Sequence, residues 1–264
     1  MQSDAHAVAC RGDARGASRW TRPYVTLRAF VDQRQRVYSC SGSFHRGLNP
    51  TRSVPLLSFN TIDTRIRGMS SGEAIHGLGT DSKAIEDYYQ EWGPEKYEAN
   101  LREWGYNAPS VVINKVTEMC ATAPVESARV LDAGCGSGFQ IADFQAAGFP
   151  GANVSAIDIW QGGLDAAAKR GYYGSLSKVD LQTAPYPFDD HTFDAVISVG
   201  VLTYINPDSP CLSELIRVTK PGGIICYTNR TDKCDLWAPV EKALEDSGKW
   251  ESVERSDRLP YLPN

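Results

Sequence analysis

The most informative stretch of this sequence is Asp132-Ala133-Gly134-Cys135-Gly136-Ser137-Gly138, called the glycine loop below. It follows the apolar run 128–133 and precedes the amphipathic segment 139–147, so it predicts a strand, a tight turn and a helix. Glycines allow a tight turn and let a ligand approach the main chain closely. The helix start adds free N–H groups and a positive dipole end, which favours a nucleotide-like ligand or a carboxylate.

Three helices are predicted before this loop, and from residue 128 onward strands and helices are predicted to alternate. The runs predicted as strands are 128–133, 153–159, 175–181, 193–201, 224–229 and 250–258. The segments predicted as helices are 82–92, 95–104, 108–122, 139–147, 163–170, 210–219 and 238–247. Asp81 or Ser82 is expected to cap the first helix and Ser209 the helix that begins with Pro210, while 221–223 is expected to form a turn. This order predicts an α/β fold with a doubly wound parallel sheet.

Length and charge divide the chain into two parts. The 264 residues suit one α/β domain with an extension. Residues 1–68 hold eleven Arg, no Lys, four Asp and no Glu, a net charge of +7, which leaves −12 for residues 69–264. We therefore predict a domain over 69–264 after a basic, disordered extension over 1–68. Three interpretations of the extension stay open: a segment upstream of a start at Met69, a mitochondrial transit segment, or a basic arm.

Composition excludes several classes of protein. No apolar run approaches the length of a membrane-spanning helix, and the first residues lack the apolar core of a secretory signal. The seven cysteines are odd in number and form no C-x-x-C pair, which argues against a disulfide framework or a zinc ribbon. We expect a cytoplasmic protein with no membrane partner and no metal site, or a mitochondrial one if residues 1–68 are a transit segment.

Two classes of cofactor are held by loops of this kind. The dinucleotide fingerprint G-x-G-x-x-G/A would place Phe139 where a small residue is needed, so an NAD-dependent oxidoreductase is disfavoured. The spacing D-x-G-x-G-x-G instead resembles motif I of the class I S-adenosylmethionine-dependent methyltransferases. Asp158 ends the second predicted strand, where an acid can accept hydrogen bonds from both ribose hydroxyls of either cofactor.

Further runs resemble the same family. They are 180–181, 185–194 and 215–223, in the order that the family has them around its third, fourth and fifth strands. Residues 84–264 also resemble the methyltransferase-like proteins named for the Williams–Beuren syndrome chromosome region, through 89–97, 199–202, 217–223 and 228–231, with Gln90, Gly93 and Glu98 replacing the usual Asp, Ala and Asp. The family adds an antiparallel seventh strand between the fifth and sixth. No run after 250–258 can form it, so we predict a Rossmann-like sheet of order 3-2-1-4-5-(7)-6 that lacks the seventh strand, in a chain truncated at its C-terminal end.

The resemblance implies S-adenosylmethionine as the cofactor and residues that contact each of its parts. Asp132, Gly134, Gly136 and Gly138 are implied at the methionine end. The other implied contacts are Tyr89 and Tyr97 as a cover, Asp158 at the ribose, Ile159 or Trp160 against the adenine ring, Asp180 and Leu181 at the adenine edge, and Gly200 near the reacting methyl group. For the two tyrosines, aromatic packing of a short helix stays open as the alternative.

Three residues at predicted strand ends are candidate substrate ligands. Tyr204, Asn229 and Arg230 should face the crevice at the carboxyl ends of the strands. Arg230 would suit a carboxylate. The alternative is that these side chains fix the loops on which they lie.

The predicted function is methyl transfer to a small-molecule or protein acceptor. The cofactor carries the reactivity, so no universal catalytic residue is expected. Residues 199–202 lack the N/D-P-P-Y/F motif of amino-group methylases, and the −12 charge of residues 69–264 argues against a nucleic-acid partner. The alternative is a catalytically silent methyltransferase fold that senses the cofactor or binds a partner, suggested by the missing strand and the altered 89–98 pattern.

Overall fold

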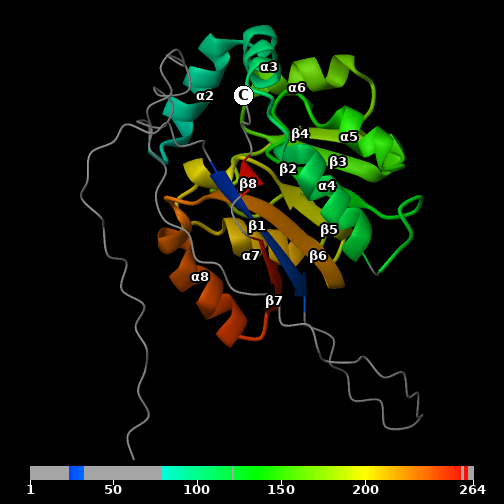
Figure 1. Cartoon of the computed structure of the whole chain (residues 1–264), viewed down its shortest axis with the longest axis vertical. Helices are drawn as coiled ribbons and strands as arrows, with labels where there is room; N and C mark the ends of the chain where they lie inside the picture. The colour runs from blue at the N-terminus through cyan, green and yellow to red at the C-terminus, as the bar shows by residue number, and fades with distance from the viewer. Residues whose placement is uncertain (1–23, 33–78, 121, 257–258, 261–264) are drawn as a thin grey trace, which may run out of the picture.

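The computed structural model describes residues 24–32, 79–120, 122–256 and 259–260 (Figure 1). Its sheet has the strand order β4-β3-β2-β5-β6-β1-β7. The first five strands in this order are parallel: β4 (Ser175–Lys178), β3 (Val154–Asp158), β2 (Val130–Ala133), β5 (Phe193–Ser198) and β6 (Thr219–Arg230). The predicted Rossmann-like order 3-2-1-4-5 is therefore confirmed.

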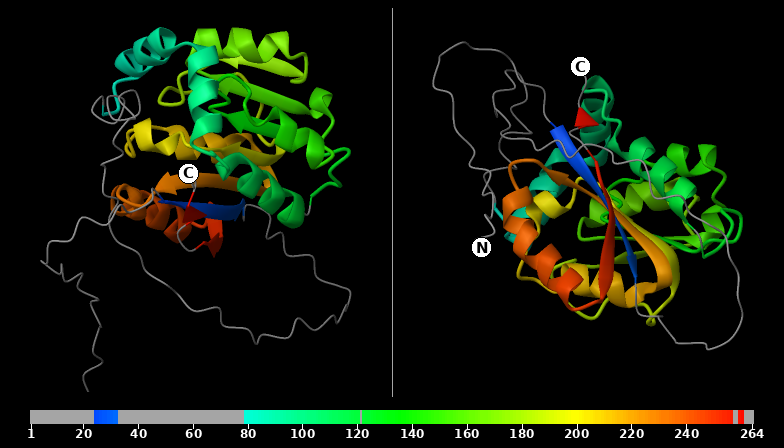
Figure 2. Two further views of the ribbon diagram at one scale, coloured as in Figure 1. Left: turned by 45° about the horizontal axis from the view of Figure 1, so that its top comes forward. Right: turned by 60° about the horizontal axis from the view of Figure 1, so that its bottom comes forward.

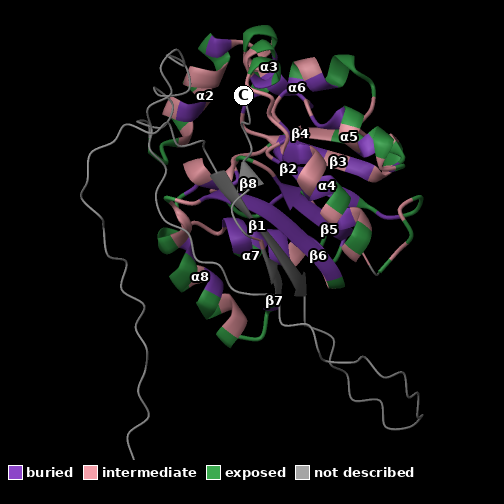
Figure 3. Ribbon diagram, in the orientation of Figure 1, coloured by how far each residue is buried: buried purple, intermediate pink, exposed green. Residues whose placement is uncertain are grey.

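Successive side chains of a strand point to opposite faces of a sheet. Because both sets are apolar in the central strands, helices cover both faces. On one face, α4 (Ala108–Met119) and α5 (Ile141–Ala146) pack on alternate residues of the central strands, Val130 and Ala195 among them. On the other face, α7 (Cys211–Val218) and α8 (Cys234–Asp246) pack on the residues between, such as Leu131. Figure 3 shows the central strands buried and the outer sides of the helices exposed.

Three further helices frame the carboxyl ends of the parallel strands. α6 (Gln161–Lys169) packs along β3 and β4. α2 (Ser82–Trp92) and α3 (Pro94–Glu103) precede the parallel strands in the chain, contact α6 and are called the lid below. The predicted Asp81 cap is confirmed, since the Asp81 carboxylate accepts a hydrogen bond from the N–H of Ala84 at 3.0 Å. Among the described helices, none is long and apolar enough to cross a bilayer.

The prediction of a missing seventh strand is wrong. β1 (Tyr24–Asp32) lies between β6 and β7 (Trp250–Arg255) and is antiparallel to both. It pairs with β6 from Val25 opposite Arg230 to Val31 opposite Ile224. Figure 2 shows this strand beside β6 and β7. The short β8 (Leu259–Pro260) pairs with the first two residues of β1, Tyr24 and Val25. The place of the seventh strand is thus filled from the opposite end of the chain.

This strand also corrects the predicted extension over residues 1–68. Residues 24–32 belong to the sheet, although they lie on the N-terminal side of the boundary predicted at Met69. Their signal was the run Tyr-Val-Thr-Leu-Arg-Ala-Phe-Val, which is rich in the β-branched and aromatic residues that strands favour. The three interpretations of the remaining residues of this segment concern positions outside the described residues.

Two local predictions are also wrong. α7 has Pro210 at its N-cap position with no side-chain hydrogen bond, so Ser209 does not cap it. The predicted turn 221–223 lies inside β6, which begins at Thr219. The partners of β5 jump from Phe193 opposite Thr219 to Ala195 opposite Ile224, so residues 220–223 form a bulge in a continuous strand.

Candidate functional site

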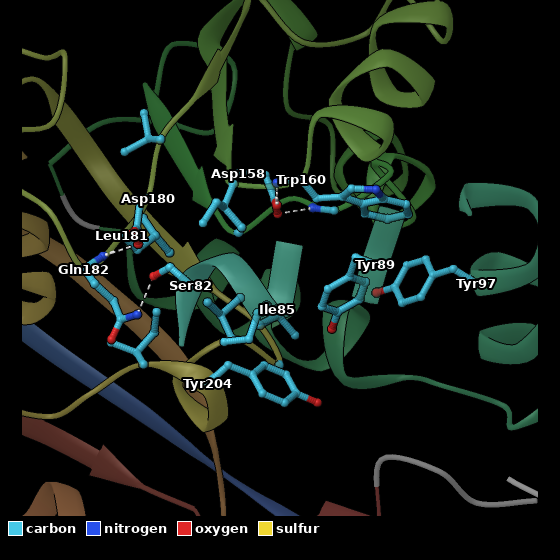
Figure 4. Close-up of a pocket in the computed structure, with 18 residues that line it drawn as sticks. Ser82, Ile85, Tyr89, Tyr97, Asp158, Trp160, Asp180, Leu181, Gln182 and Tyr204 are labelled. Atoms are coloured by element: carbon cyan, nitrogen blue, oxygen red, sulfur yellow. Dashed lines mark hydrogen bonds between the residues drawn. The ribbon is translucent and has the colours of Figure 1, made fainter. Parts of the chain in front are cut away.

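A cavity lies at the carboxyl ends of the parallel strands, between the sheet and the lid (Figure 4). Its interior and open mouth together enclose about 660 Å³. β2, β3 and β5 meet here, where the strand order reverses direction, which is where open α/β sheets bind ligands. The described lining residues are Ser82, Ile85, Tyr89, Tyr97, Gly134, Gly136, Asp158, Ile159, Trp160, Val179, Asp180, Leu181, Gln182, Val199, Gly200, Val201, Tyr204 and Ile205.

Most of the residues predicted from the sequence meet in this cavity. The predicted residues that line it are Tyr89, Tyr97, Gly134, Gly136, Asp158, Ile159, Trp160, Asp180, Leu181, Gly200 and Tyr204. The four that do not are Asp132, Gly138, Asn229 and Arg230. The first two belong to the glycine loop itself, whereas the last two end β6 outside the lining.

The glycine loop needs its glycines for conformation and for space. Gly134 has φ +89°, and a Cβ there would lie 2.2 Å from Cγ2 of Val201. Gly136 has φ +54°, with only the Tyr97 ring near its missing Cβ, at 3.8 Å. Left-handed backbone of this kind disfavours other residues. The loop therefore presents bare main chain to the cavity at Gly136, under the Tyr97 ring.

Asp158 joins the end of β3 to the glycine loop. Its Oδ2 accepts a hydrogen bond from the N–H of Gly136 at 2.7 Å, and its Oδ1 accepts one from the N–H of Trp160 at 2.8 Å. Burial raises the pKa of Asp158 above its ordinary value, and these two N–H groups counter part of the rise. The carboxylate thus holds the loop in place and lines the cavity at once.

Asp132 lies behind the loop and is fully buried. Its Oδ2 accepts hydrogen bonds from Gln140 and from the hydroxyl of Tyr173, both at 2.7 Å. Its Oδ1 has no partner among the described residues. Burial raises the pKa of Asp132 to about 7, against the opposing effect of its two hydrogen bonds. Near neutral pH this carboxyl group is therefore divided between its neutral and charged forms.

The raised pKa of Asp132 predicts a pH-dependent stability. Between about pH 4, the pKa of an unfolded Asp, and about pH 7, the folded chain holds a proton that the unfolded chain has lost. The free energy of unfolding of the wild type should therefore fall as the pH rises through this window. Asp132→Asn cannot ionise, so its melting temperature relative to wild type should increase from about pH 5 to about pH 8. Thermal unfolding at both pH values measures this, and a difference that does not change with pH would contradict it.

Gln182 connects the sheet to the lid and was missed by the sequence analysis. Its Nε2 donates a hydrogen bond to Oγ of Ser82 at 2.6 Å (Figure 4) and another to the carbonyl of Thr80 at 2.9 Å. Its Oε1 accepts one from the N–H of Asn206 at 2.7 Å. Its own N–H donates to Asp180 at 2.9 Å. The only available signal was its place directly after the predicted pair Asp180 and Leu181.

Aromatic rings roof the cavity. Tyr89 and Tyr97 of the lid lie 5.4 Å and 5.6 Å from the ring of Trp160, and Tyr204 lies 6.5 Å from Tyr89, all between ring centroids. Burial raises the pKa of both Tyr89 and Tyr97, so their hydroxyls stay protonated. The two interpretations of these tyrosines are compatible, because the rings pack together and line the cavity.

The two substrate candidates at the end of β6 lie elsewhere. Arg230 is buried, and its Nε and Nη2 donate to the two carboxylate oxygens of Asp232 at 2.9 Å and 2.8 Å. This bidentate pair fits the loop-fixing alternative for Arg230. Asn229 is fully buried, and neither polar atom of its side chain has a partner among the described residues. Neighbouring residues of a strand face opposite ways, so a position at a strand end does not by itself place a side chain in the crevice.

The charge of the lining is negative. Asp158 and Asp180 are its charged side chains, and no Lys, Arg or His is among the described residues that line it. Nor does the described part of the chain hold a group of three or more His, Cys, Asp or Glu placed to bind a metal ion. The cavity is thus suited to an uncharged or cationic ligand with hydroxyl or amino groups.

Comparisons with known proteins agree on one family. Residues 131–227 match the family described as "Methyltransferase domain". The chain is 34% identical over 188 residues to "Methyltransferase-like protein 27" of Homo sapiens, covering 68% of this chain and 73% of that protein. It is 33% identical over 129 residues to "Fatty-acid O-methyltransferase" of Mycolicibacterium smegmatis, covering 48% of this chain and 46% of that protein.

A solved structure is also similar. The S-adenosylmethionine-dependent methyltransferase from Mesorhizobium loti has 20% sequence identity and a TM-score of 0.38, over 47% of this chain and 54% of that one. The chain spans about half the length of this protein and of the mycobacterial relative.

Proposed function

Because this chain belongs to the class I S-adenosylmethionine-dependent methyltransferases, we propose that it binds S-adenosylmethionine in the cavity under the lid and methylates a small-molecule or protein acceptor. The observation that carries the proposal is the meeting of the glycine loop, Asp158 and the pair Asp180 and Leu181 around one cavity at the strand ends. These residues are far apart in the sequence, and the family resemblance implies a cofactor contact for each of them.

The residues present fit this cofactor. S-adenosylmethionine carries an adenosine with two ribose hydroxyls and a cationic sulfonium, which the negative lining suits. The bare main chain at Gly136 leaves room where a Cβ would point toward Tyr97. Behind this loop, and outside the cavity lining, Oδ1 of Asp132 is a buried acceptor with no partner among the described residues. A buried oxygen without a partner is costly and calls for a polar group or a water.

Each part of the cavity then has a role. The main chain of Gly134 and Gly136 would hold the methionine end, and Asp158 would accept hydrogen bonds from the ribose. The adenine would lie by Ile159 with its edge at Asp180 and Leu181. Asp132 and Gly138, which do not line the cavity, would instead keep the loop in shape. Tyr89 and Tyr97 would cover the cofactor.

When bound, the cofactor supplies an electrophilic methyl group on its sulfonium sulfur. The chain contributes by positioning the cofactor and the acceptor and by excluding water from the cavity. The cavity lining also includes the apolar side chains of Ile85, Val201 and Ile205. Gly200 is held there by a hydrogen bond from its N–H to Oγ1 of Thr228 at 2.8 Å. No Lys or His is among the described lining residues, and the hydroxyls of the lid tyrosines stay protonated. We therefore expect this site to assist methyl transfer by positioning the reactants rather than by removing a proton.

Two measurements on the full chain test the proposal. Calorimetry should detect binding of one S-adenosylmethionine, and labelled S-adenosylmethionine should transfer its methyl group to an acceptor in fractionated cell extract. Absence of binding would reject the proposal. Binding without transfer in every fraction would favour the catalytically silent alternative. One of the two observations that suggested this alternative, the missing strand, no longer holds, since β1 fills the place of that strand.

A further inference from the structure

Glu98 is a buried carboxylate at the contact between the lid and the glycine loop. It is 6% exposed and, with Leu101, makes up the buried residues of α3. Its Oε1 accepts hydrogen bonds from Oγ of Ser137, at 2.7 Å, and from the guanidinium of Arg170. Its Oε2 accepts one from Arg102, at 2.7 Å. One carboxylate thus joins α3, the glycine loop and the end of α6.

These contacts keep Glu98 charged. Burial alone would raise the pKa of Glu98, but the hydrogen bonds from Ser137 and Arg170, with the charge of Arg170, hold it below its ordinary value. A carboxylate that stayed buried without such partners would cost several kcal/mol, so the closed position of Glu98 depends on its contacts with Ser137 and Arg170. Arg102 adds little, since its side chain is 61% exposed.

The position of Glu98 next to Tyr97 gives this contact a consequence for the cavity. The Tyr97 ring covers Gly136 and packs against Trp160, and Gly136 is the residue before Ser137. The hydrogen bond between Glu98 and Ser137 therefore also holds the neighbouring Tyr97 ring over the glycine loop. At the other end of the lid, Gln182 holds Ser82. Between these two polar contacts the cavity side of the lid is formed by Ile85 and the aromatic rings.

We propose that Glu98 is a positioning residue that locks the lid onto the glycine loop through Ser137 and Arg170, and so sets how slowly the cofactor leaves. The proposal rests on the proposed function for the identity of the cofactor. The contact of Glu98 with Ser137 and Arg170, called the lock below, exists without cofactor, because all three residues belong to this chain.

Hydrogen exchange and cofactor release test the proposal in the full chain. Glu98→Gln keeps the shape of the side chain and removes its charge. Without cofactor, we expect amides of residues 82–103 to exchange about tenfold faster in this variant, as for a lost interaction of about 1.4 kcal/mol. With cofactor, stopped-flow release should accelerate by a similar factor, while kcat at saturating cofactor changes by less than about threefold.

Matched variants separate the lock from general damage. Glu95→Gln changes an exposed carboxylate in the first turn of the same helix and should behave as the wild type. Ser137→Ala should give a smaller effect in the same direction. The double variant Glu98→Gln with Ser137→Ala should exchange about as fast as Glu98→Gln alone, because the two residues act through one contact.

Two results would overturn the proposal. One is exchange over 82–103 in Glu98→Gln that matches Glu95→Gln. The other is faster exchange throughout β2 and β5 as well as the lid, which would show that Glu98 supports the whole fold rather than the lid. If the wild type binds no S-adenosylmethionine, the proposed function fails, and the exchange measurement on the free protein still decides on the lock.

Discussion

Replacing Asp158 with alanine is expected to weaken S-adenosylmethionine binding by about 100-fold. The wild-type carboxylate holds the N–H groups of Gly136 and Trp160 and lines the cavity where the ribose is expected. A hydrogen bond to a charged group contributes about 1.5–3 kcal/mol, so losing two such contacts, whether to the loop or to the ribose, is enough for a 100-fold change. Calorimetry on the full chain measures it.

Two variants accompany this measurement. Asp165→Asn changes an exposed carboxylate on α6, seven residues further along, and should leave the affinity unchanged. Asp158→Asn keeps the shape and one acceptor oxygen, so its affinity should fall between those of the wild type and the alanine variant. An Asp158→Ala protein that melts as a folded chain and binds with wild-type affinity would contradict the assignment of Asp158 to the cofactor.

Breaking β1 is expected to destabilise the whole sheet. Ala29 pairs with Cys226 of β6 on one side and with Glu254 of β7 on the other. Proline in a strand paired on both sides removes a ladder hydrogen bond and leaves its acceptor unpaired, so Ala29→Pro should lower the free energy of unfolding by about 1–3 kcal/mol. Denaturant unfolding measures the loss. Ala29→Ser keeps the N–H group and serves as the control.

A deletion provides the stronger test of the same strand. A chain that begins at Met69 lacks β1, so β6 and β7 lose their shared neighbour and expose two unpaired strand edges. We expect this chain to aggregate or to melt far below a chain that lacks only residues 1–23, which keeps β1 and serves as the comparison. A chain from Met69 with the melting temperature of the full chain would show that β1 does not stabilise the fold.

Most of the predicted residues that line the cavity could be identified because they depend on local sequence. The glycine loop, Asp158 and Asp180 each follow a short apolar strand, and the carboxyl ends of parallel strands meet at one edge of the sheet. Asn229 and Arg230 also end a strand, yet neither lines the cavity. For these two residues, a position at a strand end did not predict a place in the cavity. The bulge at 220–223 and the pairing of β6 with β1 depend on how the strands pair, which the local sequence pattern does not show.

Glu98 and Gln182 were missed for a different reason. In the sequence, Glu98 stands out only as a replacement for the usual Asp of the family pattern, and Gln182 is a polar residue after a strand. Their importance comes from Ser137, Arg170 and Ser82, which approach them only when the lid lies on the sheet.

The sequence by itself determined the strand–loop–helix order, the parallel core and the acids at its strand ends, since hydrophobic period and turn residues act over a few neighbours. Only the tertiary structure decided which segment fills the place between β6 and β7 and how the lid is held over the cavity. Both depend on pairs of groups far apart in the chain, such as Val25 with Arg230 and Glu98 with Ser137, whose meeting no local pattern encodes.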